Sequence, residues 1–130
     1  MVISLVYFHN CGSQRQAVKA WGLKIATQKA IWQIDTVTAV LVPSHIDSAK
    51  IVNLAWSKYN LSLGVGLNKV AGRVFRIGHL GSLNELELLG AIAGVELVLV
   101  ECEVDVKLGS GVAAASAHLL KSTPLIASRI

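Results

Sequence analysis

The sequence predicts an α+β domain, with a small, mostly antiparallel sheet of two or three strands and helices on one face. Three observations lead to this prediction. Helical and β-branched segments follow one another in the order α-β-α-β-β-α-α, no internal repeat or linker interrupts them, and the 130 residues match the length of one ordinary domain.

The first two predicted elements are a helix over residues 13–23 and a strand over residues 36–42. Apolar residues recur on one face of the helix, and Gly22 lies near its end. These apolar residues are Ala17, Val18, Trp21 and Leu23. The strand is the compact, β-branched run TVTAVLV, which Pro43 closes.

A second helix is predicted over residues 46–59. The stretch from Ser44 to Asp47 has the form of a capping box in which Asp replaces the usual Glu, and Asn60 ends the helix. The spacing i, i+3, i+4, i+7 predicts that the apolar face of this helix carries Val52, Ala55, Trp56 and Tyr59.

Two short strands are predicted over residues 61–65 and 73–77, on either side of the glycine-rich stretch GVGLNKVAG. This stretch could bring backbone N–H groups to a phosphate, but its spacing fits neither a dinucleotide-binding motif nor a P-loop. A tight turn between the two strands is the better interpretation.

Two helices are predicted in the last third of the chain, over residues 83–98 and 111–121. Ser82 with Glu85 forms a second capping box before the first of these helices. Between the two helices, over residues 100–106, apolar and acidic residues alternate with the period of a strand. An earlier helix end followed by an edge strand or extended segment is therefore an alternative here.

The composition limits the partners that the chain can have. Apolar residues make up 53% of the chain and charged residues only 15%, which favours apolar faces that another domain or subunit covers. The net charge is +4, but Lys and Arg are scattered and do not alternate with aromatic residues, which argues against nucleic acid. No apolar run approaches the ~18 residues of a membrane-spanning helix.

The residue types that carry most chemistry form no complete site in the sequence. Cys11 and Cys102 lie far apart and are typical of reduced thiols in an intracellular protein. No pair of histidines has the spacing of a metal site, and no nucleophile, base and acid form a recognisable catalytic set. We therefore expect no metal and no catalytic residue.

Arg76 is the one charged side chain with a specific interpretation. It lies within the apolar run VFRI, where a half-buried guanidinium group needs a carboxylate or phosphate to meet it. A guanidinium group binds a planar carboxylate through two parallel hydrogen bonds. A structural role is equally open: alternation places Arg76 opposite Phe75 and Ile77, on the exposed face of an edge strand or beside an internal Glu.

The last three residues are Ser128, Arg129 and Ile130. They are small, basic and aliphatic, like the peroxisomal address Ser-Lys-Leu. The tripeptide predicts a targeting signal and a peroxisomal location.

The segment YNLSLGVGLNKVAGRVFRIGHLGSLNELELLGAIAGVE resembles the C-terminal small domain of serine–glyoxylate and alanine–glyoxylate aminotransferases. These are class V, fold-type I enzymes that depend on pyridoxal phosphate, and the likeness is nearest to the plant peroxisomal photorespiratory members. It extends through AVKAWGLK, TVTAVLVPSHID and GSGVAAAS to the final SRI. We expect an unmatched segment over residues 1–12 and one domain over residues 13–130.

The resemblance implies specific roles. In this family the arginine of the FRIG segment binds the carboxylate of the amino or keto acid, which implies that role for Arg76. It also implies pyridoxal phosphate as cofactor, serine, alanine and glyoxylate as substrates, a homodimer and a place in photorespiration. The family's large domain, which precedes the matched region, supplies the Schiff-base lysine and most cofactor contacts. We therefore expect no cofactor-binding residue in this chain, and an inactive chain when it is isolated.

Two classes of function remain open on the sequence. The chain is either a transaminase domain that works only within a complete enzyme, or a non-catalytic module that binds small acids or another protein. A remnant of a partial gene copy that binds nothing is the third possibility.

Overall fold

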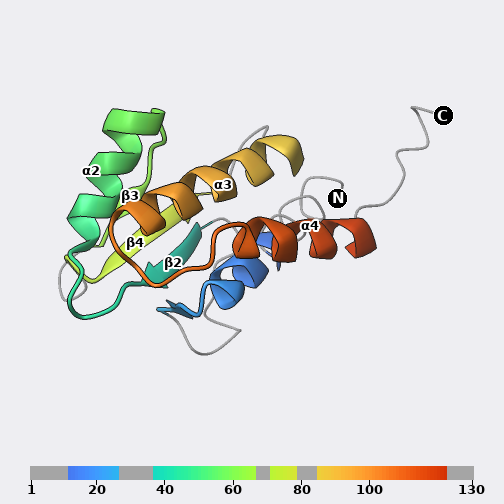
Figure 1. Cartoon of the computed structure of the whole chain (residues 1–130), viewed down its shortest axis with the longest axis horizontal. Coiled ribbons are helices and arrows are strands. Elements are labelled where there is room, and N and C mark those ends of the chain that lie inside the picture. Colours follow the sequence, from blue (N-terminus) through green and yellow to red (C-terminus); the bar gives the residue numbers. More distant parts are fainter. Residues whose placement is uncertain (1–11, 27–36, 67–70, 79–84, 123–130) are drawn as a thin grey trace.

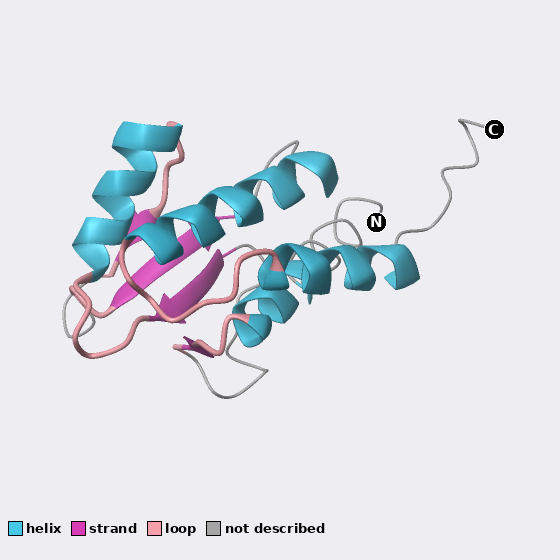
Figure 2. Cartoon of the chain, in the orientation of Figure 1, coloured by secondary structure: helices cyan, strands magenta, loops and turns pink. Residues whose placement is uncertain are grey.

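The computed structural model describes residues 12–26, 37–66, 71–78 and 85–122. Over these residues the chain forms two layers, a four-stranded sheet and a set of helices, and Figure 2 shows α2 and α3 on one side of the sheet. The strands are β1 (Lys24–Ile25), β2 (Val37–Leu41), β3 (Gly64–Val65) and β4 (Val74–Gly78). The helices are α2 (Ser48–Tyr59), α3 (Glu85–Glu101), α4 (Ser110–Ser122) and a first helix over residues 12–20.

The strands lie in the order β1-β2-β4-β3, and every neighbouring pair is antiparallel. The predicted α+β class with a small antiparallel sheet and helices on one face is therefore confirmed. The sheet has four strands rather than the predicted two or three, because Lys24 and Ile25 pair with β2 over two residues. A pairing of two residues is too short to leave a periodic signal in the sequence.

The register of the central strands separates two faces of the sheet. Val40 pairs with Phe75, and both side chains are completely buried in the core. Ile77, two residues beyond Phe75, points to the same face and is 3% exposed. Arg76 lies between them and points to the opposite face. The inward face packs with buried residues of α2 and α3, and Figure 1 shows α3 crossing in front of the sheet.

The helix predicted over residues 46–59 begins later than predicted, and the set of its residues that faces the core differs from the predicted set. Asp47, not Ser44, is the N-cap residue, and its carboxylate accepts a hydrogen bond from the Ala49 N–H at 3.0 Å. The buried positions are Ser48, Ile51 and Ala55, whereas Trp56, predicted on the apolar face, is 61% exposed. Ala55 is buried as predicted, and Val52 and Tyr59 pack against the core, so the apolar face is shifted toward Ile51 and away from Trp56 alone. Asn60 ends the helix as predicted, with a φ of 53°.

Helix α3 does not end early, and no strand follows it over residues 102–106. Glu103 adopts a left-handed φ of 61°. The Glu103 N–H donates to the Val100 carbonyl, and the Val104 N–H donates to the Leu99 carbonyl, which together form a Schellman motif. This motif packs Val104, only 5% exposed, against the last turn of the helix. The alternation that suggested a strand thus reflects a helix end that buries one valine.

A buried carboxylate joins three helices. Glu96 of α3 is 3% exposed, and its Oε1 accepts hydrogen bonds from Trp21 Nε1 at 2.9 Å and from the Gly111 N–H at 2.8 Å. Its Oε2 accepts the Gly109 N–H at 2.7 Å. These backbone groups lie at the start of α4, where N–H groups lack partners within the helix and favour a negative charge. A Cβ atom on Gly111 would lie only 2.2 Å from Trp21 Nε1, so this junction needs a glycine.

A second, exposed cluster ties the end of α2 to the end of α3. Lys58 forms an ion pair with Glu101, and the Tyr59 hydroxyl donates to Glu101 Oε1 at 2.8 Å. The hydrogen bond from Lys58 lowers the pKa of Glu101, and the bond to Glu101 raises the pKa of both Lys58 and Tyr59. No helix in the described part of the chain is long and apolar enough to cross a membrane.

Replacing Glu96 should destabilise the fold strongly. Glu96→Ala leaves the Trp21 indole N–H and the backbone N–H groups of Gly109 and Gly111 without their buried acceptor. We therefore expect a loss of about 2–4 kcal/mol in the free energy of unfolding. Urea denaturation followed by circular dichroism measures this loss. The exposed substitution Asp105→Asn removes one negative charge nearby in the sequence and should change the free energy by under about 0.5 kcal/mol. Equal effects of the two substitutions would contradict the role of Glu96.

The Glu101 cluster should contribute to stability only between two pH limits. The lowered pKa of Glu101 means that its contribution is complete above the ordinary carboxyl value of 4.5 and disappears as the pH falls through the lowered value. The raised pKa values of Lys58 and Tyr59 mean that their contribution is complete below about pH 10 and disappears as the pH rises through the raised values. Glu101→Gln should therefore lower the urea midpoint at neutral pH, and the difference should shrink as the pH falls below 4.5 and as it rises above about 10. A difference that stays constant across this range would refute the assignment.

Candidate carboxylate-binding site

Arg76 occupies the middle of β4, an internal strand of the sheet. Its side chain is half-buried and lies on the face opposite Phe75 and Ile77. The residues paired with Arg76 on the two neighbouring strands are both small: Ala39 on β2 and Gly64 on β3. The edge-strand position considered from the sequence is therefore wrong, because β4 has a neighbour on each side.

The guanidinium group of Arg76 is held against β3. Its Nε donates a hydrogen bond to the Val65 carbonyl at 3.0 Å. A Cβ atom added to Gly64 would lie 3.0 Å from Arg76 Nε and 3.3 Å from Nη2, so the group rests directly over this glycine. Among the described residues, no carboxylate is bonded to Arg76, so the internal Glu considered from the sequence does not appear among them.

This arrangement distinguishes two edges of the Arg76 guanidinium group. One edge of the guanidinium group, formed by Nε and Nη2, faces β3. The end formed by Nη1 and Nη2 has no bonded partner among the described residues. Two parallel N–H donors are the arrangement that binds a carboxylate in a planar, bidentate pair. These donors match the hydrogen-bonding needs of a small organic acid.

The sequence did not identify Gly64 and Val65 as parts of this site. Both were assigned to the end of a strand and the start of a tight turn. A pairing register for the two strands flanking that turn would have placed Gly64 opposite Arg76, but the turn length alone does not determine the register.

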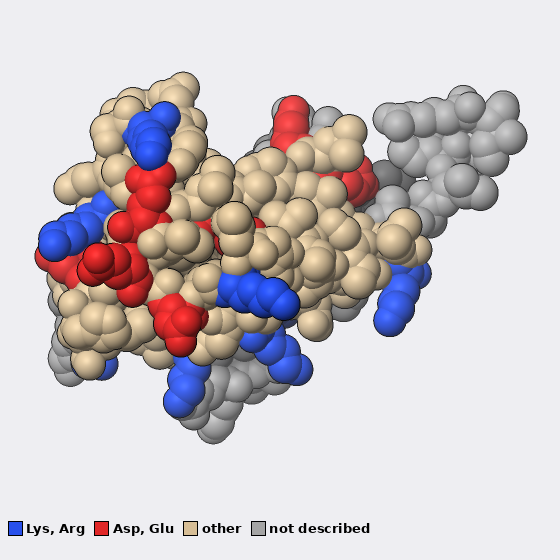
Figure 3. All heavy atoms as spheres, in the orientation of Figure 1, with Lys and Arg blue, Asp and Glu red and all other residues tan. Residues whose placement is uncertain are grey.

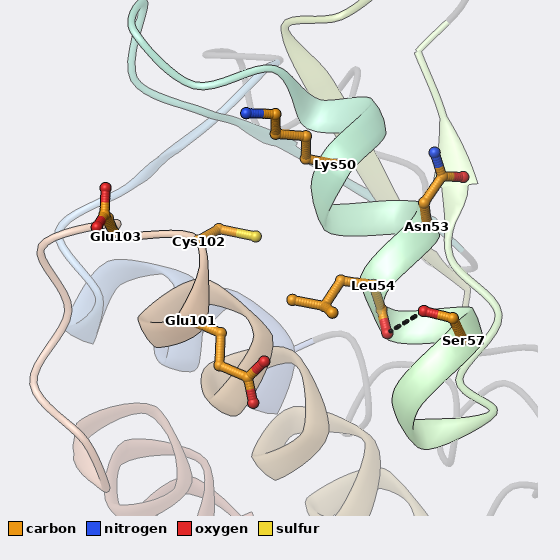
Figure 4. A pocket seen from close by; sticks show the side chains of 7 residues that line it. All are labelled: Lys50, Asn53, Leu54, Ser57, Glu101, Cys102 and Glu103. Atoms are coloured by element: carbon orange, nitrogen blue, oxygen red, sulfur yellow. Dashed lines mark hydrogen bonds between the residues drawn. The ribbon is translucent and has the colours of Figure 1, made fainter.

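A second hollow lies between α2 and the end of α3, and it contains none of the predicted site residues. It is an open pocket of about 490 Å³, and Figure 4 shows the side chains that line it. Both signs of charge are present, with Lys50 on α2 and Glu101 and Glu103 opposite. Burial, together with the Glu101 charge, raises the pKa of the Cys102 thiol, which keeps the thiol protonated and weakly nucleophilic. This pocket offers no reactive group.

The remaining predictions about site residues have different outcomes. The targeting tripeptide of Ser128, Arg129 and Ile130 and the loop residue His79 lie outside the described residues. In the described part of the chain, no three His, Cys, Asp or Glu side chains gather to hold a metal ion. Lys and Arg side chains are spread over the face in Figure 3, with Asp and Glu between them, rather than gathered in one basic patch.

Comparison with curated proteins finds mostly relatives that are named aminotransferases, together with two that are named soluble hydrogenase subunits. The chain is 64% identical over 116 residues to the serine–glyoxylate aminotransferase of Arabidopsis thaliana, and the match covers 89% of this chain and 29% of that enzyme. It is 59% identical over 111 residues to the serine–glyoxylate aminotransferase of Methylorubrum extorquens, covering 85% of this chain and 27% of the relative. An L-aspartate–glyoxylate aminotransferase of Paracoccus denitrificans is 45% identical over 109 residues, which are 84% of this chain and 28% of that enzyme.

Solved structures agree on the fold. A pyridoxamine–pyruvate aminotransferase of Mesorhizobium loti superposes with a TM-score of 0.82 at 22% identity, over 88% of this chain and 30% of that one. A ureidoglycine–glyoxylate aminotransferase of Bacillus subtilis superposes with a TM-score of 0.81 at 23% identity, over the same shares. No protein-family model matches the chain.

The chain spans less than a third of the length of the curated relatives that it matches. Within that span the sequence identity is high and the fold is that of the matching region of known aminotransferases. The chain therefore belongs to the family of serine–glyoxylate aminotransferases, among the class V aminotransferases, and corresponds to their C-terminal small domain.

Proposed function

We propose that this chain forms the part of a serine–glyoxylate or alanine–glyoxylate aminotransferase that binds the substrate carboxylate. In the complete enzyme the amino group of serine or alanine passes to glyoxylate, which becomes glycine. The names of the three relatives described above share glyoxylate and differ in the amino donor, serine or L-aspartate, so they support glyoxylate more firmly than any one donor.

The observation that carries this proposal is the geometry of Arg76. Its Nε is bonded to the Val65 carbonyl at 3.0 Å, and its terminal nitrogens are available on the sheet face away from the core. A carboxylate bound there fixes one end of the amino acid, so that its Cα–H bond and amino group are held in a defined orientation. Fixing that orientation lowers the entropy cost of the reaction, which is catalysis by positioning.

The described residues do not fit the role of anchoring pyridoxal phosphate, which supplies an electron sink when it is bound. A lysine that holds this cofactor must lie in an enclosed site, whereas each lysine that the structure describes is exposed. These lysines are Lys19, Lys24, Lys50, Lys58, Lys107 and Lys121. We propose that the cofactor is anchored in the large domain of a complete, homodimeric enzyme, and that the isolated chain does not transaminate.

We place the small domain over residues 13–130, with residues 1–12 as a separate segment. The tripeptide Ser128-Arg129-Ile130 is proposed to direct the protein to peroxisomes, and the enzyme to act in photorespiration there. The identity of 64% to an Arabidopsis enzyme supports the plant setting, although a bacterial relative is nearly as similar, at 59%.

Arg76 can be tested in a full-length chimera in which this chain replaces the matching region of the Arabidopsis enzyme. Arg76→Lys keeps the charge but loses the planar fork, so KM for serine and for glyoxylate should rise at least about tenfold, and Arg76→Ala should raise it further. Cofactor absorbance should stay unchanged in both variants. The matched control is the exposed Arg73, where Lys or Ala should leave both KM values intact.

Two results would count against this proposal. Unchanged KM values in Arg76→Ala would leave the arginine with a structural role only. Turnover of serine with glyoxylate by the isolated chain would show that the catalytic set is complete without a large domain.

The targeting signal can be tested separately from the chemistry. A fluorescent protein extended by the last ten residues of the chain should collect in peroxisomes of plant cells, because the tripeptide resembles Ser-Lys-Leu. The same fusion without Ser128, Arg129 and Ile130 is the control and should stay diffuse. A diffuse signal from both fusions would make the peroxisomal location wrong.

A further inference from the structure

We infer that Gly64 is a positioning residue of the carboxylate site, and that Arg76 therefore takes the carboxylate end-on, through Nη1 and Nη2. This inference rests on the proposed function. Gly64 does not touch the substrate in this account. It acts through the position that it allows the guanidinium group to adopt.

The absence of a side chain at position 64 creates the space in which the guanidinium group lies. A Cβ atom there would meet three atoms of Arg76: Nε at 3.0 Å, Cβ at 3.2 Å and Nη2 at 3.3 Å. Such distances are shorter than ordinary van der Waals contacts, so the arginine would have to move by a few tenths of an ångström. The backbone of Gly64 is not in the left-handed region, so position 64 itself can accept alanine.

The Val65 carbonyl decides which edge of the guanidinium group remains for a ligand. A carboxylate can pair with an arginine either side-on, through Nε and Nη2, or end-on, through Nη1 and Nη2. The side-on edge is occupied, because Nε donates to the Val65 carbonyl at 3.0 Å and Nη2 lies over Gly64. Only the end-on pair is left, and its direction is set by the contact with β3.

A side chain at position 64 would disturb this arrangement in a specific way. The shifted guanidinium group would lose its hydrogen bond to Val65 or turn its terminal nitrogens away from the acid. Either change weakens binding of the carboxylate while the fold and the positive charge remain. The effect must therefore depend on the presence of a guanidinium group at position 76.

A double-mutant cycle in the full-length chimera tests this dependence. Gly64→Ala in the parent should raise KM for serine and for glyoxylate about threefold to tenfold, with a smaller change in kcat. In an Arg76→Lys background, which has neither Nε nor a terminal fork, Gly64→Ala should raise KM less than about twofold further. The matched control is Gly90→Ala, because a Cβ on Gly90 of α3 meets nothing within 4 Å. It should leave KM unchanged.

The possible outcomes separate this inference from the proposed function. Equal KM increases from Gly64→Ala in both backgrounds, or no increase in the parent, would overturn the positioning role of Gly64. Unchanged KM values in Arg76→Lys and Arg76→Ala would instead overturn the proposed function. The melting temperature of each variant shows whether it has folded. A Gly64→Ala variant that does not fold would also overturn the inference, because the glycine would then be required by the fold rather than by the site.

Discussion

The register in which β4 pairs with its two neighbours separates the core from the candidate site. Phe75 pairs with Val40 on one side and Val65 on the other, while Arg76 pairs with Ala39 and Gly64. A slip of one residue would turn every side chain of β4 to the other face, placing the guanidinium group in the core and Phe75 in solvent. The cost of burying a charge without a partner therefore holds the strand in its observed register, and that register alone brings the glycine under the arginine.

The arrangement of the helices was predictable where the apolar pattern was local, and less so where distant residues meet. The core positions Ala17, Val18 and Trp21 follow from helical spacing, and all are buried. In the sequence, Glu96 is only an acidic residue within an apolar stretch. Its structural role could not be predicted, because its partners Trp21 and Gly111 are distant in the chain. Trp56 was assigned to the apolar face because large apolar residues are expected to be buried. The buried apolar residues of this helix are instead the smaller Ile51 and Ala55.

In the candidate site, too, some residues could be predicted from the local sequence and others could not. Arg76 stands out in the sequence because a charge interrupts an apolar strand, and such a charge needs a partner. Its neighbours Gly64 and Val65 could not be identified, because they contribute an absent side chain and a backbone carbonyl, neither of which leaves a chemical signature in a sequence. The family resemblance supplies a role for the arginine but says nothing about which edge of the guanidinium group is open. That distinction comes from the pairing of β3 with β4.

The most direct measurement is a crystal structure of the full-length chimera with a bound substrate acid. The account predicts that both carboxylate oxygens lie within hydrogen-bond distance of Arg76 Nη1 and Nη2, roughly 2.7–2.9 Å, while Nε keeps its bond to the Val65 carbonyl. A carboxylate bound to other residues, with the Arg76 side chain still over Gly64 and its terminal nitrogens in solvent, would contradict it.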